Sequence, residues 1–484
     1  MTQPAAVEVR SWGWRHASRR AWAVRGVDLT IAPGERVLLL GASGAGKSTL
    51  LHGLAGVLGG ADEGESEGTI LLDGDAAAAG RGRAGLVLQD PDSQVILARV
   101  GDDVAFGCEN LGVPRDEIWP RVDAALVDVG LDVPRHWPTK ELSGGQKQRL
   151  ALAGVVAMQP GLVLLDEPTA NLDPDGVVEV RDAVARLLDG HGTTLVVVEH
   201  RVDVWLPVVD RVVVLVGGGS PGVIADGRPA EILGVHGEQL ARAGIWVPGH
   251  PPREPGAPAS APGELLLSAR DLAVQRVAGH PIADGIDLDV RAGEILAVTG
   301  PNGAGKSTLG LTLAGLLPPA SGELRAQPTL ANGIGARPID WSSRELLTRI
   351  GTVFQEPEHQ FLSRTVRAEL EVGPRALGMP AEVMDRIVND LLRRMRLDHL
   401  AAANPYTLSG GEQRRLTVAS MLATAPRVLI LDEPTFGQDS TTWASLVALL
   451  SELRDGGSAI VVVTHDLDAV RALHAREFRL RGRP

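Results

Sequence analysis

Two glycine-rich segments with a lysine and a serine at fixed positions indicate phosphate chemistry. Gly41–Ser48 and Gly300–Ser307 both follow the pattern Gly-x-x-x-x-Gly-Lys-Ser. Glycines allow successive backbone N–H groups to face a phosphate at the positive end of a helix, the lysine reaches the β- and γ-phosphates, and the serine hydroxyl ligates Mg²⁺. Each segment follows a predicted strand and opens a predicted helix, which is the context that the motif requires. The sequence therefore predicts two sites for a magnesium-bound nucleoside triphosphate.

All residues of the two loops are candidate nucleotide contacts. A glycine-rich turn with an incidental lysine would look similar in one copy, but two copies in register argue strongly against that interpretation. The candidates are Gly41, Ala42, Ser43, Gly44, Ala45, Gly46, Lys47, Ser48 and Thr49 in the first copy and Gly300, Pro301, Asn302, Gly303, Ala304, Gly305, Lys306, Ser307 and Thr308 in the second.

The two loops belong to a duplicated domain. Lys306 follows Lys47 by 259 residues, and Ser409 follows Ser143 by 266. These spacings are far longer than a solenoid repeat, so they indicate two copies of a whole domain. The offset changes by seven residues between the two pairs, and Gln327–Ser343 is predicted to be a surface insertion that accounts for the change.

Length and composition fit this division. The chain has 484 residues, which is too many for one ordinary core. Residues 1–246 and 264–484 are predicted to be the two domains. Residues 247–263 are predicted to be the linker, because this stretch is dense in proline and lacks apolar periodicity. In a polyproline conformation, at about 3.1 Å per residue, the linker could span roughly 50 Å.

Short, continuous apolar runs alternate with helical stretches in both copies. Such runs predict strands buried on both faces, as in a parallel sheet covered by helices. The matched runs are Arg36–Leu40, Leu162–Leu165 and Leu195–Val198 in the first copy and Ile295–Thr299, Val428–Leu431 and Ile460–Val463 in the second. The predicted fold class is therefore α/β, with a mostly parallel sheet as the core of each domain.

A second repeated motif carries a family resemblance. Leu142-Ser-Gly-Gly-Gln-Lys-Gln-Arg149 and Leu408-Ser-Gly-Gly-Glu-Gln-Arg-Arg415 resemble the signature sequence of ATP-binding-cassette (ABC) ATPases. In each copy the signature serine stands 23 residues before the aspartate of an Asp-Glu-Pro-Thr segment. The resemblance covers nearly the whole chain. It implies two tandem P-loop NTPase domains, each with a sheet core and a helical subdomain, that bind and hydrolyse MgATP.

The resemblance assigns the metal ligands. An aspartate at a strand end would hold Mg²⁺ directly or through water, beside the loop serine. The glutamine of the family's Q-loop would touch Mg²⁺ or the attacking water and would sense a membrane partner. The implied ligands are Ser48, Gln89 and Asp166 in the first copy and Ser307, Gln355 and Asp432 in the second.

The resemblance also assigns the catalytic residues. Glu167 and Glu433, each next to a metal-binding aspartate, would polarise the attacking water. His200 and His465 end a further strand and match the switch histidines that contact the γ-phosphate. The alternative is that the glutamates and the histidines are ordinary polar residues at strand ends. Each histidine, however, follows its glutamate at the spacing that the family requires.

In the family, ATP is held between the P-loop of one domain and the signature of the other. The site built on the first P-loop would be completed by Ser409, Gly410 and Gly411, and the site built on the second by Ser143, Gly144 and Gly145. Asn171–Asp173 and Gly437–Asp439 match the D-loop, which crosses the dimer interface in the family. A duplicated chain could therefore close both sites by itself.

One position distinguishes the two copies. Trp14 lies 33 residues before Lys47 and fits the aromatic residue that stacks on adenine in the family. The second copy has no aromatic residue in the corresponding stretch, where Arg276 is the nearest match, and a planar guanidinium can also stack on a base. The alternative is that Trp14 is an ordinary strand aromatic.

Composition limits the setting in which the protein works. The formal charge of −13 provides no basic field for non-specific nucleic-acid binding. The single cysteine, Cys108, excludes an internal disulfide and fits a reducing cytosol. No run approaches the ~20 apolar residues of a membrane helix, and no signal peptide is evident. A role at a membrane would therefore depend on a partner.

Three kinds of ABC ATPase compete: a transporter motor, a tandem ATPase acting on ribosomes, and a DNA-repair or chromosome ATPase. Ribosome-acting members usually have a longer, charged helical linker, and repair members carry zinc-binding cysteines or long coiled coils. Transport is favoured because the chain shows none of these features.

Within transporters, Gln89–Gln94 and Gln355–Gln360 resemble the corresponding segments of energy-coupling-factor importers of vitamins and transition-metal ions. Two-cassette sugar importers are the main rival, although their second P-loop is often degraded. The resemblance implies a transmembrane coupling subunit, a small membrane substrate-binding subunit and a place on the cytoplasmic face of the membrane. The apolar pairs Val95-Ile96 and Phe361-Leu362 are predicted to face a helix of the membrane subunit, or else to belong to the helical subdomain's core.

Overall fold

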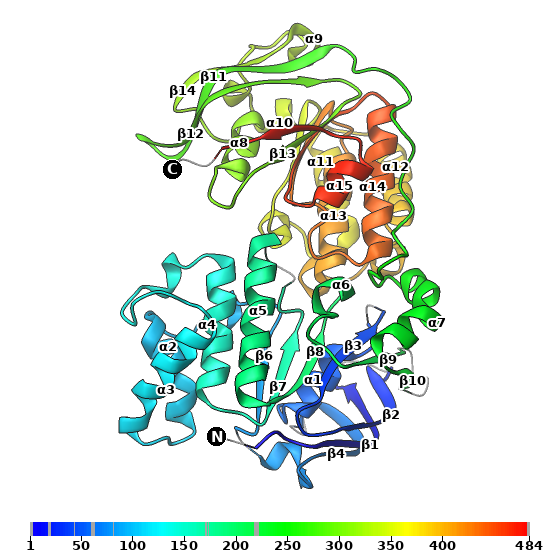
Figure 1. Cartoon of the computed structure of the whole chain (residues 1–484). Coiled ribbons are helices and arrows are strands. Elements are labelled where there is room, and N and C mark those ends of the chain that lie inside the picture. The colour runs from blue at the N-terminus through cyan, green and yellow to red at the C-terminus, as the bar shows by residue number, and fades with distance from the viewer. Residues whose placement is uncertain are drawn as a thin grey trace. The chain divides into compact units, whose positions relative to one another are not determined.

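The chain folds into two compact units, which are the two copies of the repeat. The computed structural model describes residues 3–17, 21–42, 44–59, 63–80, 82–169, 172, 174–216 and 222–481. The first unit extends to Pro252, and the second comprises Arg253–Gln438 and Thr442 onward (Figure 1). The boundary lies inside the segment predicted to be the linker. Residues 247–252 group with the first unit and residues 253–263 with the second.

A mostly parallel sheet forms the core of the first unit. Its strands lie in the order β10-β9-β3-β8-β7-β6, and only the β10–β9 pair is antiparallel. Every residue of β7 and β8 is buried, which explains their continuous apolar sequence. The bounds are β3 Arg36–Gly41, β6 Ala84–Val87, β7 Leu162–Asp166, β8 Thr194–Val198, β9 Arg211–Leu215 and β10 Val223–Gly227.

Helices cover this sheet and also form a separate helical subdomain. Helix α1 packs against β7 and β3, while α2, α3 and α4 pack on one another. The helices are α1 Lys47–Leu54, α2 Val100–Asn110, α3 Arg115–Asp128, α4 Gly144–Ala157, α5 Pro174–His191, α6 Val202–Trp205 and α7 Pro229–Arg242, with short 3₁₀ turns at Ala77–Ala79, Asp92–Gln94 and Thr139–Glu141.

Each unit also has an antiparallel sheet that the sequence did not predict. In the first unit its order is β2-β1-β4-β5, and the β1–β4 ladder shifts register between Arg10 and Gly13. In the second unit its order is β12-β11-β14. The bounds are β1 Val7–His16, β2 Val24–Ile31, β4 Gly64–Leu72, β5 Asp75–Ala76, β11 Leu265–Val277, β12 His280–Arg291 and β14 Ser321–Ala326.

The main sheet of the second unit is entirely parallel, in the order β15-β16-β17-β13-β18. The strands are β13 Ile295–Thr299, β15 Ile350–Val353, β16 Val428–Asp432, β17 Ala459–Val463 and β18 Arg476–Arg479. The helices are α8 Lys306–Leu313, α9 Pro328–Ala331, α10 Ser343–Leu346, α11 Val366–Ala376, α12 Ala381–Arg394, α13 Gly410–Leu422, α14 Ser440–Asp455 and α15 Leu467–Ala472, with 3₁₀ turns at Pro338–Asp340, Pro357–Gln360, Asp398–Leu400 and Pro405–Thr407. The predicted α/β class with parallel sheets is confirmed.

Most residues of the insertion at Gln327–Ser343 are exposed, and a few side chains attach it to the core of the second unit. Leu330 and Trp341 are 1 % and 7 % exposed and belong to the core of the second unit. The Trp341 indole N–H donates to the Gly335 carbonyl at 2.6 Å. The insertion therefore lies mainly at the surface, with Leu330 and Trp341 anchoring it to the core.

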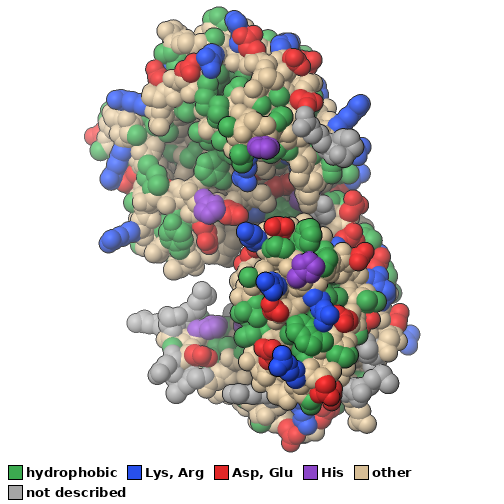
Figure 2. Space-filling view, turned by 90° about the vertical axis from the view of Figure 1, so that its left-hand side faces the viewer, with side chains coloured by type: hydrophobic (Ala, Val, Ile, Leu, Met, Phe, Trp, Pro, Cys, Tyr) green, Lys and Arg blue, Asp and Glu red, His purple; other side chains and the backbone are tan. Residues whose placement is uncertain are grey.

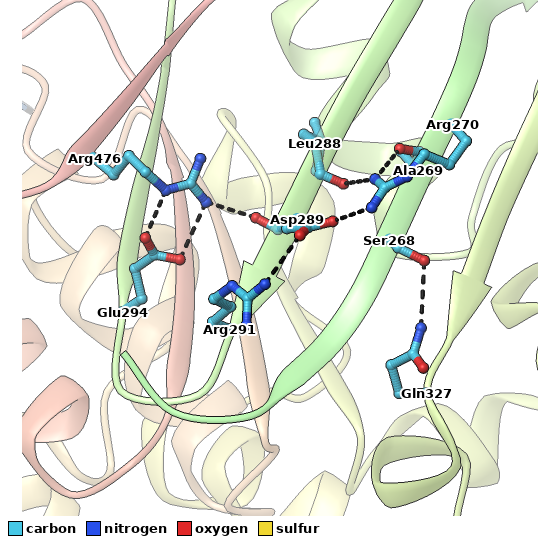
Figure 3. A network of polar contacts seen from close by, with 9 residues as sticks. All are labelled: Ser268, Ala269, Arg270, Leu288, Asp289, Arg291, Glu294, Gln327 and Arg476. Carbon is cyan, nitrogen blue, oxygen red and sulfur yellow. Dashed lines mark hydrogen bonds and ion pairs between the residues drawn. The ribbon is translucent and has the colours of Figure 1, made fainter. Parts of the chain in front are cut away.

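A repeated ion pair ties the antiparallel sheet to the parallel sheet in each unit. In the second, Arg476 of β18 pairs with Glu294 at 2.6 Å and donates to the Asp289 carbonyl on β12 (Figure 3). In the first, Arg211 of β9 pairs with Glu35 at 3.1 Å and donates to the carbonyl of Thr30 in β2. These residues occupy equivalent positions in the repeat, so the same joint is built twice.

Acidic and basic side chains are interspersed on the face that Figure 2 displays. Many charged side chains of the described residues form ion pairs, for example Arg25 with Glu67 and Arg394 with Glu452. Across the described ranges, no helix has both the length and the hydropathy needed to cross a bilayer.

Candidate active site

The first glycine-rich loop joins β3 to α1 in a backbone conformation that requires glycine. Gly46 immediately precedes the helix and has φ of 86°, a left-handed value that favours glycine. A Cβ there would lie 2.6 Å from the carbonyl oxygen of Ala23. The Lys47 ammonium donates to the carbonyls of Gly41 and Ala42 at 2.8 and 3.2 Å. The loop therefore wraps around the lysine head group.

The second loop repeats this geometry between β13 and α8. Gly305 has φ of 94°, and the Lys306 ammonium donates to Gly300 and Pro301 at 2.8 and 3.1 Å. Burial lowers the pKa of Lys47, against the opposing pull of the Glu167 and Asp166 carboxylates. Ser43, a predicted contact in the first loop, lies outside the described residues.

The strand-end aspartates have the features of magnesium ligands. The Ser48 hydroxyl hydrogen-bonds to Asp166, and the Ser307 hydroxyl to Asp432. One oxygen of each aspartate, Oδ1, is buried and has no hydrogen-bond partner. Burial raises the pKa of Asp166 and raises that of Asp432 to about 6. A buried carboxylate oxygen without a partner, next to a hydroxyl, suits a divalent cation.

The described residues contain no cluster of three or more His, Cys, Asp or Glu side chains arranged for a metal. A bound ion would therefore depend on one carboxylate and one hydroxyl, with phosphate oxygens and water completing its shell. Mg²⁺ at nucleotide sites is usually bound in this way, because it gives up its waters reluctantly. When bound, it would neutralise charge on the β- and γ-phosphates.

The glutamates that follow these aspartates are held in a strained backbone conformation. Glu167 and Glu433 have φ of 47° and 48°, which is uncommon for a residue with a side chain. Their N–H groups donate to Val198 and Val463 at the ends of β8 and β17, at 2.9 and 2.8 Å. The neighbouring strand therefore fixes the direction in which each carboxylate points.

Each glutamate contacts a switch histidine. His200 Nε2 lies 2.9 Å from Glu167 Oε1, and His465 Nδ1 lies 2.8 Å from Glu433 Oε1. Burial alone would raise the pKa of Glu167, but the hydrogen bond and charge of His200, with Lys47, hold it below its ordinary value. Burial alone would lower the pKa of His465, but Glu433 outweighs burial and raises it. Each carboxylate is therefore held in place by its histidine.

The two predicted Q-loop glutamines differ. Gln89 Nε2 donates to Glu167 Oε2 at 2.8 Å, so the first unit brings this glutamine to the catalytic group. Gln355 is exposed and has no hydrogen bond to Glu433 among the described contacts. The two sites therefore have different surroundings in this structure.

The signature serines begin helices and face solvent. Ser143 and Gln146 form a reciprocal capping box at the start of α4, and Ser409 and Glu412 form one at the start of α13. Both serines are exposed, and the glycines that follow them form the first helical turn. Each unit therefore presents a helix N-terminus suited to an anion. Asn171 and Asp173, predicted D-loop residues, lie outside the described part.

The burial of Trp14 contradicts the prediction that it stacks on adenine. Its side chain is 2 % exposed and packs in the core of the antiparallel sheet. Its indole N–H donates to His16 Nδ1 at 3.3 Å. Arg276, at the corresponding place in the second unit, is exposed. The bulky ring therefore serves packing, as the alternative interpretation held.

Sequence reasoning missed several polar residues around the glutamates. The Arg414 guanidinium donates to the Glu433 carbonyl and stacks over Phe436 at 5.5 Å. Glu199 and Thr464, the residues before the two switch histidines, also contact this region. Aligning the two copies would have drawn attention to Glu199 and Thr464, because the same position holds a carboxylate in one copy and a hydroxyl in the other.

A phosphate loop, a strand-end Asp-Glu pair and a switch histidine in each unit define a P-loop ATPase. The ABC transporter family matches residues 24–170 and 283–436. The chain belongs to this family and is an ATPase with two ABC domains.

Full-length relatives agree with this assignment. "Putative HMP/thiamine import ATP-binding protein YkoD" of Bacillus subtilis (strain 168) is 35 % identical and aligns with 95 % of this chain and 88 % of its own length. A "Putative ABC transporter ATP-binding protein" of Methanosarcina acetivorans is 34 % identical over 93 % of this chain and 80 % of its own. A solved structure of "RNase-L Inhibitor" has a TM-score of 0.63 at 20 % identity, covering 96 % of this chain and 87 % of that one, and is similar in fold.

Proposed function

We propose that the chain is the ATP-hydrolysing motor of an energy-coupling-factor importer for a vitamin or transition-metal ion. It would sit on the cytoplasmic face of the membrane, bound to a transmembrane coupling subunit and a small substrate-binding membrane subunit. The name of the 35 % identical Bacillus subtilis relative, which refers to HMP/thiamine import, supports this class.

Two complete sets of polar groups support hydrolysis at both P-loops. In each unit the loop lysine binds phosphate, the serine and aspartate hold Mg²⁺, and the glutamate accepts a proton from the attacking water while the histidine orients it. The signature helix of the other unit would complete each site through its exposed N-terminus. Closing on ATP would convert binding and hydrolysis into movement of the membrane subunits.

The single observation that carries the transport proposal is how each unit presents one apolar side chain. Ile96 is 59 % exposed, and its N–H donates to the Asp103 carboxylate at 2.8 Å. Leu362 is 78 % exposed, and its N–H donates to Glu369 at 2.9 Å. Single exposed apolar residues are common on protein surfaces, so the support comes from their recurrence at equivalent places in both units, with the backbone N–H held by a carboxylate in each.

The segment before each exposed residue is held equally firmly. The Gln94 side chain accepts from Leu88 N–H at 2.8 Å, and Gln360 accepts from Phe354 N–H at 2.9 Å. Phe361 is 7 % exposed, so only the second residue of this apolar pair faces outward. In this proposal the second residue of each pair contacts the membrane subunit, while the first packs against the helical subdomain's own core.

Ile96→Glu and Leu362→Glu test the proposal directly. Tagged chains would be purified from detergent-solubilised membranes of the native host, and uptake of radiolabelled HMP or thiamine would be measured. Both variants should keep basal ATPase activity but lose co-purifying membrane proteins and uptake. Val235→Glu and Val277→Glu are matched controls, because these valines are 79 % and 65 % exposed elsewhere. Normal assembly and uptake by both test variants would refute the coupling surface.

A further inference from the structure

We propose that Glu199 is a positioning residue for hydrolysis in the first unit, anchoring the loop that carries Glu167. The second unit achieves the same anchorage with a carboxylate displaced by two positions, Asp466. This inference rests on the proposed role of Glu167 as the residue that accepts a proton from water.

In the first unit the anchor starts at the end of β8. Glu199 is 3 % exposed, and its Oε1 accepts from both the backbone N–H, at 3.0 Å, and the hydroxyl of Thr169. Its Oε2 accepts from the N–H of His200 at 3.1 Å. Thr169 follows Glu167 by two residues. One buried carboxylate therefore connects the loop of the catalytic glutamate to the backbone of the switch histidine.

In the second unit the corresponding threonine has a different partner. The Thr435 hydroxyl donates to Asp466 Oδ2 at 2.9 Å, and the Trp443 indole N–H donates to the same oxygen at 2.8 Å. Asp466 aligns with Arg201 in the repeat, not with Glu199. The residue aligned with Glu199 is Thr464. The threonine–carboxylate bond is thus kept, while the residue that supplies the carboxylate has changed.

The change alters what the glutamate itself contacts. The Thr464 hydroxyl donates to Glu433 Oε2 at 3.1 Å. In the first unit, Gln89 donates to the corresponding oxygen of Glu167. Burial, together with the nearby Glu167 charge, raises the pKa of Glu199. A carboxyl buried this deeply needs hydrogen-bond partners, and Thr169 supplies two of them.

Backbone strain gives the anchor its importance. A side-chain-bearing residue held at a φ near 47° is strained, and this conformation persists only when its surroundings fix it. Glu167 is fixed by its own N–H bond to the Val198 carbonyl. Two residues further on, the loop is fixed by the bond from the Thr169 N–H to Glu199. Without the second anchor the loop can relax, and the carboxylate moves relative to the attacking water.

Exchanging the two arrangements tests the proposal. Glu199→Thr removes the anchor, and Glu199→Thr/Arg201→Asp rebuilds it as the second unit does. ATPase rates would be compared with that of Glu167→Gln, which defines the share of turnover due to the first site. A misplacement of about 1 Å costs about 100-fold in rate, so Glu199→Thr should remove at least nine-tenths of that share. The KM for ATP should change less than about threefold.

The double variant should recover most of the lost rate, whereas Arg201→Asp alone should resemble the unaltered chain. Thr169→Val should slow the same share and Thr169→Ser should not, which covers the case in which Glu199→Thr fails to fold. Unchanged turnover in both Glu199→Thr and Thr169→Val would overturn the proposal, as would a Glu199→Thr loss that Arg201→Asp fails to restore. If Glu167→Gln itself had no effect, the proposed function of this site would fail instead.

Discussion

Adding one methyl group to the two P-loops should affect them unequally. Gly46→Ala and Gly305→Ala both place an alanine at a left-handed φ, 86° and 94°, which costs about 1–2 kcal/mol. At Gly46 the new Cβ would also lie 2.6 Å from the Ala23 carbonyl and 2.7 Å from Val24 Cβ. These atoms belong to the backbone or are fixed to it, so a further penalty of about 1–3 kcal/mol is expected.

At Gly305 the nearest atom is Ile282 Cγ2, at 3.1 Å, on a side chain that can yield. If the loop must keep this conformation to bind phosphate, these costs appear as lost nucleotide affinity. At 1.4 kcal/mol per tenfold, Gly46→Ala should weaken binding by about 30- to 4000-fold and Gly305→Ala by about 5- to 30-fold. The difference between the two variants isolates the effect of the Ala23 contact.

Titration with a fluorescent ATP analogue would measure both losses. Gly46→Ala would be made with Lys306→Ala, and Gly305→Ala with Lys47→Ala, so that one site is read at a time. Gly44→Ala is the matched control, since its φ is 78° but nothing lies within 4 Å of a Cβ there. It should resemble Gly305→Ala. Equal losses at Gly46 and Gly305 would refute the steric argument.

Two further predictions concern the second unit. Because the pKa of Asp432 is raised to about 6, its carboxylate is protonated below that pH. The apparent Mg²⁺ affinity of this site should therefore fall about tenfold per pH unit below 6 and be flat above 7. Mg²⁺ titrations of Lys47→Ala from pH 5 to 8 measure this dependence, and Asp432→Asn should bind Mg²⁺ weakly at every pH. Arg476→Met leaves Glu294, whose side chain is only 10 % exposed, without its partner, so the unit should lose about 2 kcal/mol of stability, or about 4–8 °C in the thermal midpoint measured by calorimetry. Arg270→Met, at an exposed pair in the same network, should shift it far less, and equal shifts would contradict this explanation (Figure 3).

The sequence predicted the parallel sheets well because their strands are buried on both faces. Continuous runs such as Leu195–Val198 have few other interpretations, and the structure extends this one by a single residue, to Thr194. The antiparallel sheets were missed because their strands are half-buried and irregular. The β11–β12 ladder, for example, shifts register several times between Leu265 and Val277. Such pairing depends on tertiary contacts that local patterns do not encode.

Side-chain roles were harder to predict than positions. Spacing placed Glu167 and His200 correctly side by side, because both end neighbouring strands of one sheet. Spacing could not show whether Trp14 stacks on adenine or packs in the core, since a residue at this position of β1 can do either. Only the burial of its side chain in the structure distinguishes the two roles. The anchoring of Thr169 by Glu199 and of Thr435 by Asp466 was equally invisible, because the carboxylate moves between positions in the two copies.

The central claim, that each unit hydrolyses ATP through its own glutamate, is tested most directly by Glu167→Gln, Glu433→Gln and the double variant. The measurement is steady-state ATPase activity together with ATP retained by the chain after rapid desalting. Each single variant should lower turnover, since the carboxylate that accepts the proton is lost while its hydrogen-bonding shape is kept. The double variant should be inactive and should retain about two ATP per chain, one for each intact P-loop. Full turnover in either single variant would contradict the claim for that unit.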